Sequence, residues 1–134
     1  MELTATGATL SEAFARIALA LFAAAVDPAT VGDGDTREVR AHGVGPSALL
    51  QAWLQECLYV HEVEGFACRA IEFAVFETTP AAGGEALRLH AILRGEEIDP
   101  SRHPIRTAIR NVSGRGLAVE NEAIGFRVRA ILDV

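Results

Sequence analysis

The sequence predicts an α+β protein with two helices packed on one side of a mostly antiparallel or mixed β-sheet, in a single compact domain. Two observations carry this prediction. Between residues 8 and 65, hydrophobic residues twice recur at the spacing of a helix. Beyond Gly65 they alternate with the period of a strand. Half of the 134 residues are hydrophobic, so we expect residues 1–134 to form one domain with its own core.

The first predicted strand and helix lie near the N-terminus. Residues 2–6 alternate and predict a short strand. Thr9 is suited to cap the helix that follows, and Glu12 stands three residues later, as in a capping box. Pro28 lies just beyond the end of this helix. The helix directs one apolar stripe toward the core, formed by Leu10, Phe14, Ile17, Leu21 and Ala24.

A second strand and a second helix follow a turn-rich segment. Residues 36–43 alternate, with Val39 and Ala41 pointing inward. Pro46 begins the second helix, and Gly65 marks its approximate end. The buried stripe of this helix is expected to contain Leu50, Trp53, Leu54, Cys57, Leu58 and His61.

Alternation predicts the remaining strands. Pro80, Gly83 and Gly84 mark a hairpin loop between the first two of them. Residues 95–104 are polar and predict a long turn, after which a strand begins at Ile105. The residues expected to face the core are Ile71, Phe73 and Val75, then Leu87, Leu89, Ala91 and Leu93, then Ile105, Thr107 and Ile109, then Leu117 and Val119, and finally Phe126, Val128, Ala130, Leu132 and Val134.

Composition excludes several classes of protein. The longest apolar stretch, residues 17–26, is far short of the roughly 20 residues that span a bilayer. Glu2 and Glu12 precede it and no basic residue does before Arg16, whereas a secretory signal begins with a basic region. We therefore expect a cytoplasmic protein without membrane contact. The two cysteines, Cys57 and Cys68, are too few for a disulfide scaffold or a zinc site and are expected to be buried free thiols.

The net charge of −6 is unevenly distributed. All twelve basic residues are arginine, and residues 102–129 contain six of them against Glu120 and Glu122. Such a surface is compatible with RNA or with an acidic partner. A solvated sheet face explains the same charges more simply, and no aromatic RNA-recognition motif is present.

The pattern of residues gives little indication that the protein is an enzyme. Cys57 and His61 are four residues apart and share a helix face, as an activated thiolate pair would. Both fall on the apolar stripe, however, which favours buried packing. His90 is expected on a sheet surface, and His103 follows a turn where it can hydrogen-bond locally.

Asp133 stands beside the terminal carboxylate at the end of the last predicted strand. Alternation places it on the same face as Arg127, Arg129 and Ile131. The simpler interpretation is an ion pair with an arginine of a neighbouring strand, such as Arg110. The alternative is a ligand for a hard cation, which prefers carboxylate and carbonyl oxygens. One aspartate and a terminus are not sufficient, so a second carboxylate must come from elsewhere in the fold.

Several segments, read in order, resemble the archease family. These are GATLSEAFARIALALF, LLQAWLQECLYV, RGEEIDPSRHPIRTAIRNVSGRGLAVE and the final ILDV. The third resembles a family segment that runs G-E-x-x-D-P-x-R-H and then K-A-x-T-x-H-x-L-x-V. Its first part is matched by Gly95, Glu96, Asp99, Pro100, Arg102 and His103. The resemblance covers nearly the whole chain and preserves the order of the segments.

This resemblance implies a compact α+β fold and an accessory role rather than catalysis. Archeases assist the RtcB-type RNA ligase of tRNA splicing and RNA repair, which uses GTP and Mn²⁺. They promote guanylylation of the ligase and allow it to turn over repeatedly. In the family, an N-terminal Asp of a His-Thr-Ala-Asp motif joins the penultimate Asp and the last residue in holding a metal ion.

The chain departs from the family pattern at this motif. The His-Thr-Ala-Asp motif is absent, and alignment places its Asp immediately before Met1. Glu2 is the nearest acid, and strand alternation directs it to the same face as that Asp. Two explanations stay open: translation starts earlier than Met1, or the site has degenerated. In the K-A-x-T-x-H block, the family Lys, Thr and His correspond to Arg110, Ser113 and Arg115.

The resemblance therefore implies a site without catalytic residues. The implied metal ligands are Asp133, the terminal carboxylate of Val134 and, as a displaced substitute, Glu2. The cofactor would be a divalent cation, either Ca²⁺ or Mg²⁺/Mn²⁺. Arg110, Ser113 and Arg115 would contact the ligase or its nucleotide.

The expected partner is thus an RtcB-type RNA ligase, with RNA reached only indirectly, and the protein is expected to be a monomer or a weak homo-oligomer. Two alternatives remain. One is a stand-alone RNA-binding module that uses the arginines of residues 102–129. The other is a small metal-dependent or thiol enzyme, which would need Cys57 or Asp133 to be accessible in a pocket.

Overall fold

The computed structural model describes residues 1–81 and 84–134, with the backbone alone for residues 80 and 81. Its elements, in chain order, are β1 (Glu2–Gly7), α1 (Leu10–Ala25), the 3₁₀ turn η1 (Pro28–Thr30), β2 (Asp35–Val44), α2 (Pro46–Glu62), β3 (Phe66–Ala81), β4 (Gly84–Glu97), β5 (Asn111–Val112), β6 (Ala118–Asn121) and β7 (Phe126–Asp133).

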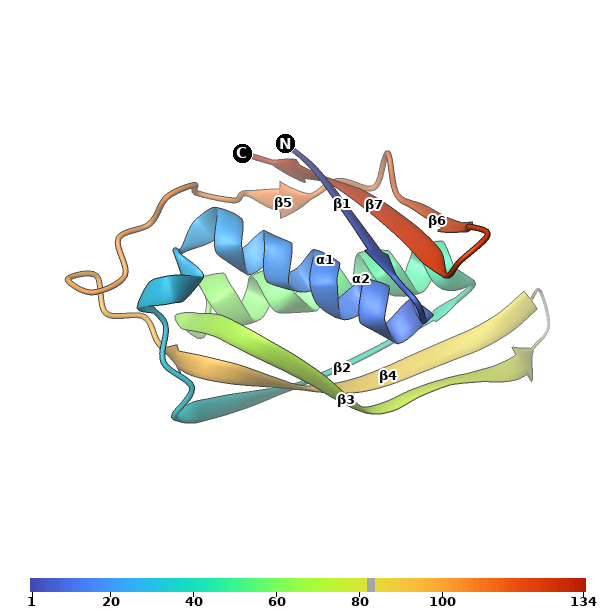
Figure 1. The fold of residues 1–134 in the computed structure, drawn as a ribbon, viewed down its shortest axis with the longest axis horizontal. Coiled ribbons are helices and arrows are strands. Elements are labelled where there is room, and N and C mark those ends of the chain that lie inside the picture. Colours follow the sequence, from blue (N-terminus) through green and yellow to red (C-terminus); the bar gives the residue numbers. More distant parts are fainter. Residues whose placement is uncertain (82–83) are drawn as a thin grey trace.

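The strands form two antiparallel sheets, and the two helices lie between them (Figure 1). One sheet has β7 at its centre, paired with β1 on one side and with β5 and β6 on the other. The other sheet has the order β2-β4-β3. The predicted α+β class with two helices is confirmed. The structure adds that the strands divide between two sheets, each of which has the helices on one side only.

Both helices begin where the sequence predicts. The hydroxyl of Thr9 accepts the backbone N–H of Glu12 at 3.1 Å, which caps α1. The Glu12 carboxylate turns instead to Arg16, 2.6 Å away, so the reciprocal half of the capping box is replaced by an ion pair within the helix. Gly45 precedes α2 with a positive φ, and Pro46 occupies the first turn. No helix of the described residues is long and apolar enough to span a membrane.

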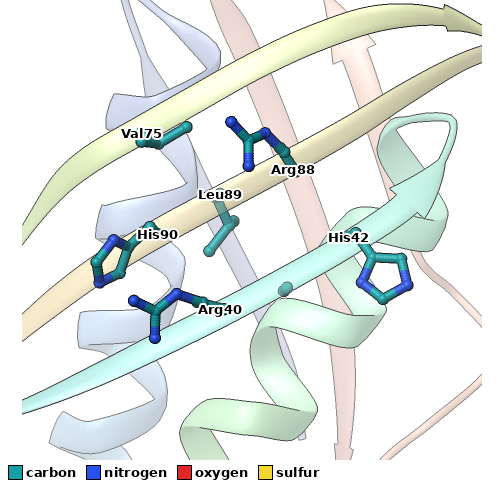
Figure 2. A pocket seen from close by; sticks show the side chains of 7 residues that line it. Arg40, His42, Val75, Arg88, Leu89 and His90 are labelled. Atoms are coloured by element: carbon teal, nitrogen blue, oxygen red, sulfur yellow. The ribbon is translucent and has the colours of Figure 1, made fainter.

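The prediction that Ile71, Phe73 and Val75 share one face is wrong at Val75. A register irregularity lies between Phe73 and Val75. It places Val75 on the outer face of the sheet, opposite His90, and turns Phe76 inward (Figure 2). Phe76 packs edge-to-face against Phe73, with 5.3 Å between their ring centroids. The bulge thus shifts the alternation by one residue, as a slip in strand register does.

Other predicted boundaries also change. The predicted hairpin is confirmed, since Ala81 pairs with Gly84, whereas Gly83 lies outside the described residues. β4 continues through Glu97, so the polar turn begins later than predicted. The strand predicted from Ile105 is wrong, because residues 105–110 are irregular and Ile105 is exposed. Ile109 is nevertheless buried, so one predicted core residue of this segment is confirmed.

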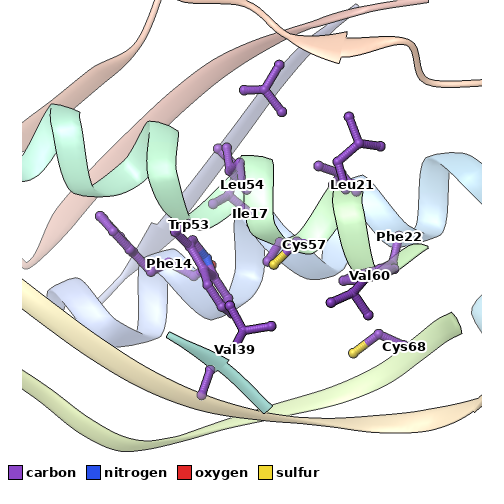
Figure 3. Packing of buried hydrophobic residues seen from close by; sticks show 14 of the residues in the cluster. Phe14, Ile17, Leu21, Phe22, Val39, Trp53, Leu54, Cys57, Val60 and Cys68 are labelled. Atoms are coloured by element: carbon purple, nitrogen blue, oxygen red, sulfur yellow. The ribbon is translucent and has the colours of Figure 1, made fainter. Parts of the chain in front are cut away.

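The core lies between the sheets, around the two helices (Figure 3). Trp53 is fully buried, and its indole N–H donates to the carbonyl of Phe14 at 3.0 Å, which joins α2 to α1. The predicted stripe of α2 is confirmed, since each of its members is buried, and Val39 and Ala41 of β2 are buried as well. Within the final strand Val128, Ala130 and Leu132 are buried, whereas Val134 is 54% exposed.

Candidate functional site

The end of β7 is held by main-chain hydrogen bonds on both of its edges. On one side, the ammonium group of Met1 donates to the carbonyl of Leu132 at 2.9 Å, and Leu132 N–H donates back to Met1 at 2.7 Å. On the other side, Arg110 N–H donates to the carbonyl of Asp133 at 2.7 Å. The alternating apolar residues of β7 direct its other face into the core. The strand end is therefore a rigid platform on which Asp133 and Val134 are exposed.

Glu2 and Asp133 lie on the same outer face of this sheet. Glu2 pairs directly with Ile131, and Asp133 follows Ile131 by two residues along β7. The two residues are therefore diagonal neighbours on adjacent strands, and residues in such pairs lie roughly 7–8 Å apart, with a somewhat shorter distance between their Cβ atoms. Both side chains are exposed, and neither forms an ion pair with the described residues. The strand register thus places Glu2 and Asp133 on one face.

The loop after β5 covers Ile131 beside these carboxylates. Ser113 N–H donates to the carbonyl of Ile131 at 2.8 Å, and the Ser113 hydroxyl accepts Arg115 N–H at 3.1 Å. Gly116 has a φ of +78°, and a Cβ at this position would lie 2.4 Å from Cδ1 of Ile131. Only glycine combines this backbone conformation with so close an approach. The loop therefore places Ser113 and Arg115 next to the end of β7.

Arginines without an ionic partner surround this site. Arg110, Arg115 and Arg129 form no ion pair with the part of the chain that the structure describes. Arg129 stands on the outer face of β7, between Thr4 of β1 and Ala118 of β6. The ion pair of Asp133 with Arg110 is absent, because the main chain rather than the side chain of Arg110 contacts Asp133. The site thus presents free carboxylates beside free guanidinium groups.

The fit of these residues to a metal ion is partial. Carboxylate oxygens of Asp133, Glu2 and the terminus are of the kind that Ca²⁺ and Mg²⁺ prefer. The described residues contain no group of three His, Cys, Asp or Glu side chains that could hold a metal ion. The donors are therefore suitable in kind and insufficient in number, since such cations take six or more oxygen ligands.

Cys57 and His61, the residues of the alternative thiol enzyme, are buried in the helix layer. Burial raises the pKa of the Cys57 thiol well above its ordinary value and lowers the pKa of His61. Burial also raises the pKa of Cys68 to about 12. A nucleophilic thiolate needs the opposite shift and access to solvent. The prediction of buried free thiols is confirmed.

A cluster of hydrogen-bonded polar side chains joins two loops. Its centre is the carboxylate of Glu96, which accepts Gly32 N–H at 2.9 Å and approaches His103 and Arg102 at 2.7 and 2.8 Å. The hydrogen bond from Gly32 is the main cause that lowers the pKa of Glu96, and contacts to His103 and Arg102 add to it. His103 is fully buried. Its ring reaches Asp99 on one side and Thr30 and Glu96 on the other. The cluster fixes the loop after α1 against the turn after β4.

The fold and the site together define a class of protein: a small two-sheet α+β protein that presents charged groups at an open strand end. A sequence-family model described as the archease protein family (MTH1598/TM1083) matches residues 1–134. The chain belongs to the archease family.

Curated relatives agree with this assignment. A protein archease of Methanosarcina acetivorans is 31% identical over 134 residues, which is 100% of this chain and 89% of the relative. A protein archease of Pyrococcus abyssi is 30% identical over 114 residues, which is 85% of this chain and 77% of the relative.

A solved structure shares the fold. The solution structure of Methanobacterium thermoautotrophicum protein 1598 superimposes with a TM-score of 0.75 and 25% identity. The match covers 99% of this chain and 89% of that structure. The two-sheet arrangement is therefore one that the family is known to adopt.

Proposed function

We propose that this protein is an accessory factor of an RtcB-type RNA ligase, which it helps to become guanylylated and to turn over repeatedly. Membership of the archease family is the observation that carries the proposal. The site supports it, because Asp133 and its neighbours lie open on a strand end rather than in an enclosed pocket. An open charged platform is suited to contact with another macromolecule.

The chain's own residues would have two roles in this complex. Asp133 and the terminal carboxylate of Val134, with Glu2 as a diagonal neighbour, would hold a divalent cation jointly with oxygen ligands from the partner or from water. Such a cation would supply positive charge near phosphate oxygens. Arg110 and Arg115 would contact the ligase or its bound nucleotide, since a guanidinium group donates to phosphate through two parallel hydrogen bonds.

Ligation assays with the cognate ligase test the proposal. RNA joined per ligase molecule is measured with and without this protein, under conditions that allow many turnovers. We expect the wild-type protein to raise the yield well above one product per ligase. Asp133→Asn is expected to remove most of this gain, whereas Asp33→Asn, an exposed aspartate in the loop before β2, is expected to keep it. Equal yields with and without the wild-type protein would refute the accessory role.

The arginines permit a second candidate function, which is RNA binding without the ligase. It is favoured by the three unpaired guanidinium groups around β7. Titration of the isolated protein with single-stranded RNA at 50 and about 200 mM salt distinguishes the two functions. Micromolar affinity that falls steeply with salt would support direct binding. The accessory role predicts little binding through these arginines in the absence of the ligase.

A further inference from the structure

A basic pocket lies on the outer face of the β2-β4-β3 sheet (Figure 2). This sheet lies on the opposite side of the helices from β7 (Figure 1). The pocket has a volume of about 330 Å³, and its polar lining consists of Arg40, His42, Arg88 and His90, with Val75 at one edge. We infer that this pocket is a binding site for a phosphate group. The inference does not depend on the ligase function, because the helix layer separates the pocket from Asp133.

Strand register brings the four basic side chains together. Arg40 of β2 pairs directly with His90 of β4, and His42 pairs with Arg88. Alternation places all four on one face, while Ala41 and Leu89 between them are buried in the core. Figure 2 shows the four side chains on the outer side of the sheet, with the helices behind it. The four residues thus lie in the continuous pairing of β2 with β4, which runs from Asp35 to Val44 without a register shift.

Cross-strand ion pairs account for only some of these four basic residues. Cross-strand pairs of opposite charge are what a merely solvated sheet face favours. Arg88 follows that rule, since it pairs directly with Glu77 of β3, and so does Arg94 outside the pocket, which contacts Glu72 at 2.7 Å. Within the pocket, Arg40 and His42 form neither an ion pair nor a side-chain hydrogen bond with the described residues. A bound anion would supply the missing partner.

Hydrogen-bond donors stay available even where an acid is present. Glu77 contacts Arg88 through Nε, which leaves both terminal nitrogens of this guanidinium without a partner among the described residues. Glu38 contacts Nε2 of His90 at 3.1 Å, which leaves Nδ1 free. A neutral His90 ring that donates to Glu38 through Nε2 carries no proton on Nδ1. The unused N–H donors that face the cavity therefore come from the two guanidinium groups and the His42 ring.

These donors fit the chemistry of phosphate. Guanidinium groups bind phosphate oxygens through paired, charge-assisted hydrogen bonds, and lysine does not reproduce this geometry. The pocket holds no set of carboxylates or thiols for a metal ion. The phosphate group has two possible sources, the backbone of an RNA strand and a free nucleotide, and the same donors would bind either.

Two-dimensional ¹H–¹⁵N NMR of the full chain tests the inference. The probes are inorganic phosphate, guanosine monophosphate and a 12-nucleotide single-stranded RNA, each titrated at 50 mM salt. We expect saturable shifts centred on Arg40, His42, Arg88 and His90. Arg40→Gln is expected to weaken binding about tenfold or more. Arg94→Gln, which removes an equal charge from the same sheet face outside the pocket, is expected to change affinity less than twofold.

The results of these titrations distinguish an RNA backbone from a free nucleotide as the source of the phosphate group, and they can disprove the site. RNA binding at least tenfold tighter than that of either small probe identifies the backbone as the source. Monophosphate binding that RNA does not exceed identifies a free nucleotide. The inference is wrong if none of the probes produces saturable shifts in this pocket, or if Arg94→Gln weakens binding as much as Arg40→Gln. Arg88→Gln provides an independent variant if Arg40→Gln alters the fold.

Discussion

Nε2 of His103 lies 2.7 Å from Oε1 of Glu96, while Nδ1 of the same ring accepts the backbone N–H of Asp99 at 2.9 Å. Since Nδ1 acts as an acceptor, the neutral ring carries its proton on Nε2 and donates it to Glu96. The contact joins residues seven apart across the turn after β4. Glu96 and His103 both belong to the segment that resembles the archease family, and this contact gives each of them a structural role.

Loss of the His103 ring should destabilise the protein. His103→Ala removes a fully buried side chain, leaves Asp99 N–H without its partner, and removes one of the three partners of Glu96. We expect a loss of about 2–4 kcal/mol in the free energy of unfolding. Urea denaturation followed by circular dichroism measures it. His42→Ala, which removes an exposed histidine, is the matched control and should change the value by less than about 0.5 kcal/mol. Similar losses in both variants would contradict this role.

Glu96 should contribute a pH-dependent part of the stability. Its pKa is lowered in the folded state, mainly by Gly32 N–H and then by His103 and Arg102. A carboxylate with a lowered folded pKa stabilises the fold above its unfolded pKa, near 4.3, and loses this contribution as pH falls through the folded value. The difference in unfolding free energy between wild type and Glu96→Gln should therefore shrink from pH 6 to pH 3. A difference independent of pH would show that the charge is not responsible.

Both thiols should be unreactive in the native protein. Cys57 and Cys68 are buried, and burial raises the pKa of each thiol. Labelling with a thiol-specific chromogenic reagent at pH 8 should be slow in buffer, and both cysteines should react promptly in denaturant. Rapid labelling of native Cys57 would revive the thiol-enzyme alternative. Cys57→Ser, which keeps the size and removes the thiol, identifies the cysteine that reacts.

Gly116 should be difficult to replace. Gly116→Ala introduces a Cβ close to Cδ1 of Ile131 on a backbone with a positive φ. We expect a loss of about 1–2 kcal/mol in unfolding free energy. Ile131→Val removes Cδ1 and keeps Cγ1, which lies 2.9 Å from the added Cβ, so the double variant should recover part of the steric loss and retain the backbone part. Gly34→Ala, at an open position without a positive φ, should be nearly neutral. Strictly additive effects of the two substitutions would rule out the contact.

The helices and most strands were predictable because their signals are local. Thr9 caps α1 and Pro46 opens α2 through contacts within one turn, and the apolar stripe of each helix needs only the helical period. Strand alternation failed at Val75, since a bulge inserts an additional residue without a clear mark in the sequence. It failed again at Ile105, because an apolar residue can be exposed in an irregular segment.

The sequence suggested residues for the candidate site and did not specify their arrangement. Alternation predicted only that Asp133 shares a face with Arg127 and Arg129, and that Glu2 shares the face of the family Asp. Their closeness depends on β1 pairing with β7 in a register that sets Glu2 opposite Ile131. The expected contact of Asp133 with the Arg110 side chain was replaced by a main-chain hydrogen bond. The hydrogen bond from Arg110 N–H to the carbonyl of Asp133 depends on the position of the short strand β5, and no local pattern in the sequence specifies that position.

The sequence by itself determined both helices, most of the strands and most of the faces they bury, and it indicated the archease family, since periodicity, caps and ordered motifs are properties of neighbouring residues along the chain. Only the tertiary structure decided that the strands divide into two sheets around the helices. It also decided which charged side chains meet: free carboxylates beside arginines at the end of β7, and Arg40 with His90 on the opposite sheet. Pairing between distant strands sets these encounters, and its register is determined by packing of the whole core rather than by any single segment.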